Sequence, residues 1–290
     1  MLAFTRGFAA ALAAAGALSG VAGSLRAETA GPFVDLAPHR AVYDVSLERT
    51  SPGSGVSDLT GRLVYEITGS RCEGYTQTMR FVTRTTNQEG QAQVTDLRTS
   101  SWEDVPAHRL RFNTANYQNE TLAEQTQGDA RRPETESKSK VDLVKPAKKT
   151  VDVASGVYFP IQHSMALVAA ARAGKTLFKA ELFDGSENGE KVFTTSALIG
   201  RIAAPGAIKM PALAESGDRL ARIPSWPVSI SYYEQGPVKG DVTPAYEMSY
   251  RFHENGVTSN LIIDHGEFAF KGELKELTFL EVSSCAPETP

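Results

Sequence analysis

The stretch "LAPHRAVYDVSL", residues 36–47, decides the fold class. Pro38 suits the start of a strand, because proline cannot donate a hydrogen bond to a β-ladder. After it the residues alternate in two sets, Ala41, Tyr43, Val45 and Leu47 on one side and Arg40, Val42, Asp44 and Ser46 on the other. A period of two predicts a half-buried β-strand rather than a catalytic loop.

The same alternation recurs along the chain, in residues 62–68, 78–84, 246–252 and 266–285. Two Asn-Gly pairs, Asn188-Gly189 and Asn255-Gly256, each lie between such segments. This dipeptide is a strong short-range signal for a β-hairpin, because both of its residues tolerate a positive φ. The sequence therefore predicts a series of antiparallel strands joined by turns.

One segment departs from this pattern. Residues 160–173, "PIQHSMALVAAARA", begin with a proline and precede Gly174, which are favoured residues at the start and just beyond the end of a helix. Residues 123–140 are predicted to form a solvated loop or an edge hairpin, and residues 203–218 an irregular connection. The expected fold is all-β and antiparallel with one principal α-helix, as a barrel, a sandwich or a wound sheet.

The first 27 residues have the pattern of a secretory signal peptide, with Arg6 followed by a run rich in Ala, Gly and Leu. We expect cleavage after Ala27, with a retained N-terminal anchor as the alternative. Residues 28–290 would then form a single domain. No later segment approaches 18 consecutive apolar residues, so no transmembrane segment is expected in the mature chain.

The charge of the chain excludes one class of partner. The formal net charge is −4, and it becomes −6 when Arg6 and Arg26 leave with the signal peptide. A nucleic-acid-binding protein needs an excess of basic residues to neutralise phosphates, and this chain has none. The expected partners are therefore a protein of the periplasm or envelope, or a lipophilic ligand.

Two cysteines, Cys72 and Cys285, lie in the predicted exported part. An even number of cysteines in an oxidising compartment favours a disulfide, and the alternative is two free buried thiols. A bridge would close a very long loop, for which the chain-entropy model gives roughly 5 kcal/mol as an upper figure. The spacing excludes a CxxC redox motif and a cysteine-rich zinc site.

A search for catalytic residues finds no motif. The five histidines are scattered, and no pair has the HExxH spacing: His39, His108, His163, His253 and His265. No GxSxG elbow and no P-loop is present. If the protein were an enzyme, the carboxylates of Asp44, Glu66, Asp184 and Asp264 would be the ones to inspect. Residues 184–195 match part of a calcium-loop pattern, but Thr195 stands where a bidentate Glu is required, so a hairpin is favoured.

Ten aromatic residues have two alternative interpretations. They fill a β-core, as such residues commonly do, or they line a lipophilic cavity on the concave side of a curved sheet. The ten are Tyr43, Tyr65, Phe81, Trp102, Tyr246, Tyr250, Phe252, Phe268, Phe270 and Phe279.

Several segments resemble the EipB-like cell-envelope integrity proteins of alphaproteobacteria, a family long described as a domain of unknown function. These segments are "LAPHRAVYDVSL" at 36–47, "FP" followed by "HSMALVAAARAG" at 163–174, and "LFDGSENGEKVFTT" at 182–195. The positions of Cys72 and Cys285 are similar too. The resemblance covers essentially the whole mature chain.

The resemblance implies a periplasmic protein with a broken, spiral-like β-barrel and a disulfide between Cys72 and Cys285. It implies a role in envelope integrity, and no catalytic residue, metal or cofactor comes with it. We therefore expect a non-enzymatic protein that binds envelope components or partner proteins. Because the shape resembles the lipoprotein carriers of the Lol system, a carrier of a lipid or an acyl chain is the alternative. An envelope hydrolase is a third hypothesis.

Overall fold

The computed structural model describes residues 34–132, 138–154, 156–208, 210, 213–235 and 243–283. All of them belong to one compact unit, Val34–Pro290. The predicted signal peptide and the cleavage site at Ala27 lie outside the described residues, so they stay predictions. Among the described residues no helix is both long and apolar enough to cross a membrane.

The first eight strands form a continuous antiparallel meander, in which each strand pairs with the next along the chain. Alternating apolar residues produce these strands, as in β1, where Ala41, Tyr43 and Val45 are at most 4 % exposed. Val42, on the other side of β1, is buried as well. The strands are β1 (His39–Thr50), β2 (Asp58–Ser70), β3 (Gly74–Thr86), β4 (Ala92–Asp104), β5 (Arg109–Gln118), β6 (Thr121–Arg131), β7 (Lys138–Lys145) and β8 (Lys149–Ala154).

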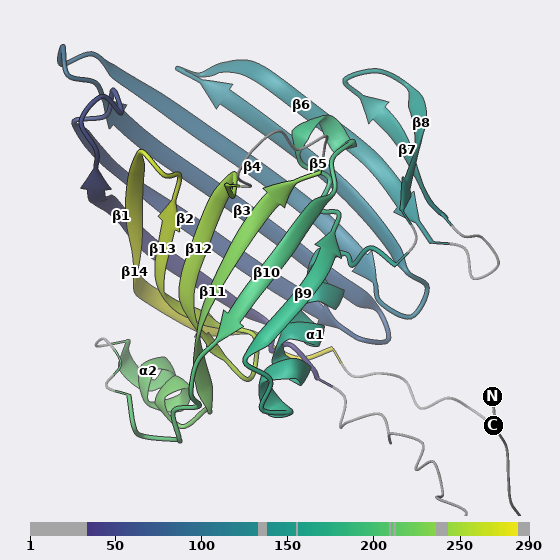
Figure 1. The fold of residues 1–290 in the computed structure, drawn as a ribbon. Helices are drawn as coiled ribbons and strands as arrows, with labels where there is room; N and C mark the ends of the chain where they lie inside the picture. The colour runs from purple at the N-terminus through teal and green to yellow at the C-terminus, as the bar shows by residue number, and fades with distance from the viewer. Residues whose placement is uncertain are drawn as a thin grey trace, which may run out of the picture. The chain divides into compact units, whose positions relative to one another are not determined.

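The second run of strands reverses back toward the first. The last strand, β14, pairs antiparallel with β1, so the two runs form one 14-stranded sheet with the order β8 to β1 followed by β14 to β9. Figure 1 shows β14, in yellow, beside β1, in purple. The strands of this run are β9 (Leu177–Leu182), β10 (Phe193–Ile199), β11 (Ser225–Glu234), β12 (Tyr246–His253), β13 (Thr258–Asp264) and β14 (Phe268–Phe279).

The sheet is not closed, because β8 and β9 stand at its two edges. Side-chain packing, rather than main-chain hydrogen bonds between strands, connects the two edges. Phe183 and Val192, from the connection between β9 and β10, share a core cluster with residues of β5 to β8. That connection includes the short 3₁₀-helix η1 (Glu187–Gly189). The expectation of an antiparallel, broken β-barrel with one principal helix is confirmed.

The predicted helix at 160–173 is confirmed as α1 (Pro160–Arg172). Ile161, Leu167 and Val168 are almost completely buried. They share the largest core cluster with residues of both runs of strands, among them Ile67 of β2, Tyr75 of β3, Trp226 and Ile230 of β11 and Phe252 of β12. Figure 1 accordingly shows α1 behind β9 and β10, between the two runs.

Glu103 of β4 anchors the first turn of α1. Its carboxylate accepts the backbone N–H groups of Ile161 at 2.7 Å and Gln162 at 2.9 Å. These N–H groups have no partner within a helix, so an acceptor at this end satisfies them. Glu103 is 0 % exposed, and this burial raises the pKa of its carboxyl to about 8.

Two local predictions need correction. The connection at 203–218 is only partly irregular, because a second helix, α2 (Ala214–Ala221), begins within it. Asn188-Gly189 is part of η1 in a long connection, although β9 and β10 do form the predicted antiparallel pair. Of the two alternatives for residues 123–140, the hairpin is the one observed, because β6 and β7 pair antiparallel one strand in from the edge strand β8. The hairpin at Asn255-Gly256 joins β12 to β13 as predicted, with a φ of 88° at Gly256.

Candidate functional site

The histidines are not brought together. His39 is buried, and its Nδ1 lies 2.7 Å from the Ala37 carbonyl oxygen. The Nδ1 atom of His108 lies close to the side chains of Gln162 and Arg132, near the start of α1. His265 stacks on Phe268 and Phe270. Each ring therefore has a local structural contact on a different element.

Two histidines contact a hydroxyl, as a catalytic dyad would. His163 Nε2 lies 3.1 Å from Thr195 Oγ1, and His253 Nε2 lies 3.0 Å from Ser259 Oγ. All four side chains are at most 5 % exposed. Burial lowers the pKa of each histidine to about 4. The Nδ1 atom of His253 has no hydrogen-bond partner among the described residues, so no carboxylate orients that ring as a triad requires.

The four carboxylates selected from the sequence are also separate. Asp44 bonds Arg62 at 3.0 Å, and Asp264 bonds Arg49 at 2.7 and 2.8 Å. Glu66 lies on β2, opposite Arg40 of β1. Asp184 follows β9 and accepts the backbone N–H of Ser186 at 2.9 Å, and burial raises the pKa of its carboxyl. Among the described residues no three His, Cys, Asp or Glu side chains form a group that could hold a metal ion.

One opening in the sheet lies between β13 and β14. Only Leu261–Asp264 of β13 pair with β14, at Ala269–Gly272. Beyond Gly272, β14 pairs with β1 alone. The cause is a β-bulge in β13 opposite β12, between the pairs Ser249–Ile262 and Arg251–Ser259. Asn260 lies in this bulge with a φ of 54°. A bulge bends its strand, and here it turns the start of β13 away from β14.

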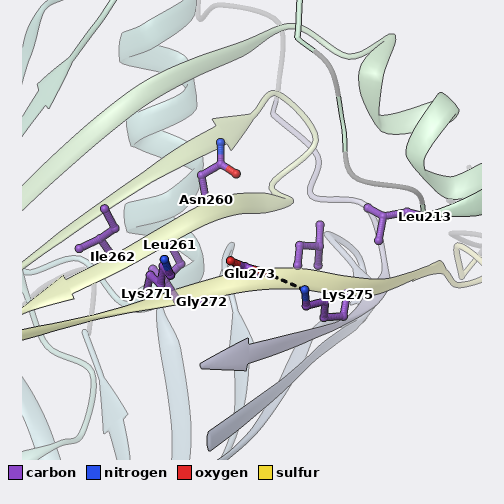
Figure 2. Close-up of a pocket in the computed structure, with 9 residues that line it drawn as sticks. Leu213, Asn260, Leu261, Ile262, Lys271, Gly272, Glu273 and Lys275 are labelled. Carbon is purple, nitrogen blue, oxygen red and sulfur yellow. Dashed lines mark hydrogen bonds and ion pairs between the residues drawn. The ribbon is translucent and has the colours of Figure 1, made fainter. Parts of the chain in front are cut away.

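The opening is a cleft of about 530 Å³, which we call the split-sheet cleft. This volume lies within the range of small-ligand sites. Figure 2 shows the two strands diverging, with Leu213 opposite the open end. The cleft is lined by Leu213, Asn260, Leu261, Ile262, Lys271, Gly272, Glu273, Leu274 and Lys275.

The backbone of β14 presents hydrogen-bonding groups to this cleft. The N–H of His265 donates to the Phe268 carbonyl at the β13–β14 turn. In an antiparallel ladder, every second residue forms its main-chain hydrogen bonds with the same neighbouring strand. Counting from Phe268, the residues Phe270 and Gly272 therefore also bond β13. By this alternation, the peptide groups of Leu274, the next position in the series, are directed toward the side from which β13 has turned away; Leu274 as a whole is 3% exposed. An extended segment could bond there as an added strand.

Two contacts hold the cleft open. Tyr43 of β1 donates its hydroxyl to the Thr258 carbonyl at 2.8 Å, which fixes the start of β13. Leu213 and Leu220, at the two ends of α2, pack with Leu274 and Leu277 of β14. The cleft is therefore fixed by residues from three separate parts of the chain.

The charged rim of the cleft is internally neutralised. Lys271 pairs with Glu48 at 3.0 Å, and Lys275 pairs with Glu273 at 2.7 Å. The neighbouring carboxylates raise the pKa of both lysines, and Lys275 lowers the pKa of Glu273. Asn260 is exposed. This environment suits an uncharged polar backbone with apolar side chains better than it suits an anion or a cation.

Most of the aromatic residues selected from the sequence lie on the inner side of the sheet. Tyr43, Phe252 and Phe270 are core residues, at most 4 % exposed. Tyr65, Phe81, Tyr246, Tyr250 and Phe268 are only partly buried. Trp102 lies on the outer side, where Arg111 covers its ring at 5.2 Å. Phe279 contacts Arg219 of α2 at 4.0 Å. The inner surface is thus part core and part accessible aromatic wall.

One of the two predicted disulfide cysteines, Cys72, lies among the described residues. Among the described residues there is no free cysteine, and Cys72 lies beside a cleft near Tyr75 and Val282. Cys285 lies outside the described residues. The pairing of Cys72 with Cys285 therefore stays a prediction.

Sequence reasoning missed both the split-sheet cleft and the role of Glu103. The Asn-Gly turn and the alternation of β13 and β14 were visible, but a bulge inserts one residue without any composition signal. Glu103 resembles any other charged residue at the end of a strand. Its function depends on α1, which is more than fifty residues away in sequence.

Comparisons with known proteins agree with this architecture. Residues 30–281 match the family model described as EipB-like. The chain is 36% identical over 257 residues to the cell envelope integrity protein EipB of Brucella abortus (strain 2308), covering 88% of this chain and 89% of that protein. It also matches the crystal structure of a beta-barrel-like protein of domain of unknown function DUF1849 from Brucella abortus. That match has a TM-score of 0.77 and 35% identity, and it covers 86% of this chain and all of that one. The chain belongs to the EipB-like family.

Proposed function

We propose that this protein maintains the integrity of the cell envelope without catalysis, from the periplasm, by binding an extended segment of a partner protein in the split-sheet cleft. The observation that carries the proposal is the one-sided pairing of β14. Its second half pairs with β1 alone, while apolar residues of β13 and β14, and Leu213 just before α2, line the space beside it. Main-chain hydrogen bonds would supply affinity, and the apolar walls would select side chains.

Three further observations support parts of this proposal. A similar protein carries the name cell envelope integrity protein. The buried histidines contact only hydroxyls, backbone or other rings, which supports a non-enzymatic role. The signal-peptide pattern at residues 1–27 and the even number of cysteines support a periplasmic location.

The cleft can be tested by crosslinking in cells. A photo-crosslinking amino acid placed at Asn260, which is exposed at the cleft, should give a discrete heavier adduct on irradiation. The same amino acid at Lys179, exposed on β9, is the control and should give none. An identical adduct pattern from both positions would show that the cleft is not a preferred binding site.

A cleft-filling variant tests the link to the envelope. Ile262 is 36 % exposed at the cleft, and Leu198 is 62 % exposed on β10. Cells that lack the protein should become sensitive to detergent, and Leu198→Trp should restore resistance. Ile262→Trp, which fills the cleft, should restore it poorly although the protein accumulates normally. Equal rescue by the two variants would contradict the proposal.

A carrier of a lipid or an acyl chain is the second candidate. The partly buried aromatic residues on the inner side, notably Tyr65, Tyr246 and Tyr250, favour it. The packing of α1 between the two runs of strands weighs against it, because the helix occupies part of that surface. Native mass spectrometry of protein purified without detergent, followed by organic extraction, should reveal a defined lipid if this candidate is right. A clean apo mass would count against it.

A further inference from the structure

The outer side of strands β2 to β6 carries an ordered layer of arginines, which we call the arginine face. The ladder register places on this side, opposite the side of Tyr65 and Phe81, seven arginines: Arg62, Arg80, Arg84, Arg98, Arg109, Arg111 and Arg131.

Three aspartates hold six of these arginines in place. Asp96 pairs with Arg80 at 2.9 Å and Arg98 at 2.7 Å. Asp129 pairs with three arginines, of which Arg131 lies at 2.9 Å and Arg111 at 3.4 Å. Asp44 pairs with Arg62 at 3.0 Å. Asp58, Glu66 and Asp104 lie on the same side, Asp104 directly opposite Arg109. Seven arginines and six carboxylates give this side a formal net charge of +1, so the arginines stand out by their exposure rather than by net charge.

The guanidinium groups form the outermost layer. The side chains of Asp96 and Asp129 are 13% and 20% exposed, whereas those of Arg62, Arg80, Arg98, Arg111 and Arg131 are 51% to 60% exposed. Asp96 and Asp129 thus lie beneath their arginines and fix their geometry, whereas Asp44 is 46% exposed beside Arg62. A fixed guanidinium retains donors for a second anion, and its planar fork matches the oxygens of a phosphate.

Exposed apolar and aromatic side chains lie among the arginines. Val94, 37% exposed, is opposite Arg84, and Leu122, 47% exposed, is opposite Tyr117. The guanidinium of Arg98 lies 4.7 Å from the centre of the Tyr117 ring. Cations beside tyrosine and aliphatic side chains are the combination that favours the headgroup region of a membrane. An acidic protein surface would interact with the arginines and would need none of the exposed apolar side chains.

The face is broad as well as charged. The seven arginines span five adjacent strands in unbroken order, which is about 20 Å at the spacing of neighbouring strands. An array of this width can contact several anionic headgroups at once. Each contact is weak when taken singly, but they add over the array.

We propose that the arginine face docks on a membrane surface of anionic phospholipids. This inference is independent of the split-sheet cleft, which lies on β13 and β14. Docking of this kind would place the cleft at a fixed orientation to the bilayer while the chain stays outside its hydrocarbon core.

The test is co-sedimentation of the full chain, purified from cells without detergent, with vesicles. Vesicles of phosphatidylcholine with phosphatidylglycerol should sediment the protein at low salt, and vesicles of phosphatidylcholine alone should not. Raising the NaCl concentration should release it, because salt screens exposed charges. Arg84→Gln with Arg98→Gln should weaken binding roughly 25-fold, about fivefold for each arginine.

Two matched variants distinguish the effect of removing arginines from this face from the effect of lowering the net charge of the protein. Arg201→Gln with Arg222→Gln removes two exposed arginines elsewhere, after β10 and after α2, and should bind like the unchanged protein. Arg84→Lys with Arg98→Lys keeps the charge and should retain most of the binding. Equal weakening by the two Gln pairs would overturn the proposal, and so would binding that ignores phosphatidylglycerol. Absence of vesicle binding together with retention on immobilised polyglutamate would assign the face to an acidic protein instead, and would equally overturn it.

Discussion

At the scale of single residues, two glycines decide how the edges of the sheet meet. Gly185 and Gly189 lie in the connection between β9 and β10 and both have a positive φ. A Cβ atom at Gly185 would lie 2.4 Å from the Phe112 ring, and one at Gly189 would lie 2.5 Å from Leu143. Because no ladder joins β8 to β9, this close approach is what lets the β9–β10 connection pack on β5 and β7, together with Phe183 and Val192.

Gly185→Ala should therefore destabilise the protein more than a comparable change elsewhere. Gly90, in the turn before β4, has the same φ of 78°, but a Cβ atom added there would meet no other atom within 4 Å. Gly90→Ala should cost about 1–2 kcal/mol for the left-handed backbone alone. Gly185→Ala should cost a further ~1–3 kcal/mol for the clash. Urea unfolding of both variants measures the difference, and equal losses would show that Phe112 moves aside freely.

At the scale of elements, α1 depends on a residue from another part of the fold. Its first turn has Pro160 and no acidic residue, and the N-cap Phe159 offers no side-chain oxygen. Glu103 of β4 supplies the missing acceptor from inside the core. The helix is thus fixed to the first run of strands by hydrogen bonds and to both runs by apolar packing.

The raised pKa of Glu103 makes the stability of the protein depend on pH. Its folded pKa of about 8 lies above the ordinary value of 4.5, so the folded protein holds this proton more tightly than the unfolded chain. The resulting stabilisation is complete below about pH 4.5 and is lost as the pH rises through about 8. Between pH 7 and 8 the protein should lose up to about 1.4 kcal/mol of unfolding free energy from this group.

Glu103→Gln should remove this component, because an amide does not titrate. The pH range 7 to 8 avoids His163 and His253, whose lowered pKa values affect stability only at more acidic pH. Chemical unfolding of both proteins at several pH values gives the difference curve. A flat difference between pH 7 and 8 would mean that the carboxylate is already ionised in the folded protein, stabilised by the helix N-terminus.

At the scale of the whole molecule, the fold depends on a seam between its first and last strands. β1 and β14 pair over His39–Thr50 and Phe268–Phe279, with two irregularities in register. Without this seam the two runs of strands would be separate meanders. The predicted bridge from Cys72 to Cys285 would add a covalent link near the same end, because Cys285 follows β14 by a few residues.

Loss of this bridge should destabilise the protein by roughly 2–5 kcal/mol. Cys285→Ser and the double variant Cys72→Ser with Cys285→Ser should lose the same amount, because both lack the same single bond. A reductant should lower the melting temperature of the unchanged protein and leave that of Cys285→Ser unaltered. Melting that does not respond to reductant would contradict a stabilising bridge.

The sequence alone determined the class of the fold and most of its elements. The alternation that begins at Ala41 and the helix that begins at Pro160 are local properties, because side-chain spacing of 2 or 3.6 residues selects strand or helix within one segment. Residues selected as catalytic candidates, such as His163 and Asp184, could be recognised in the sequence from their side-chain chemistry. Whether they interact was not visible, and in the structure they have different partners, Thr195 for His163 and the Ser186 N–H for Asp184.

Only the tertiary structure decided what the surfaces offer. The split-sheet cleft is formed by the bulge at Asn260, the hydrogen bond from the Tyr43 hydroxyl and the side chain of Leu213. These three residues lie far apart in the chain. The arginine face likewise needs five strands in register before Asp96 and Asp129 lie beneath their arginines. The alternation within one segment indicates on which side of the sheet each side chain lies. Strand pairing over long sequence distances decides which of them become neighbours, and that information is not contained in any one segment.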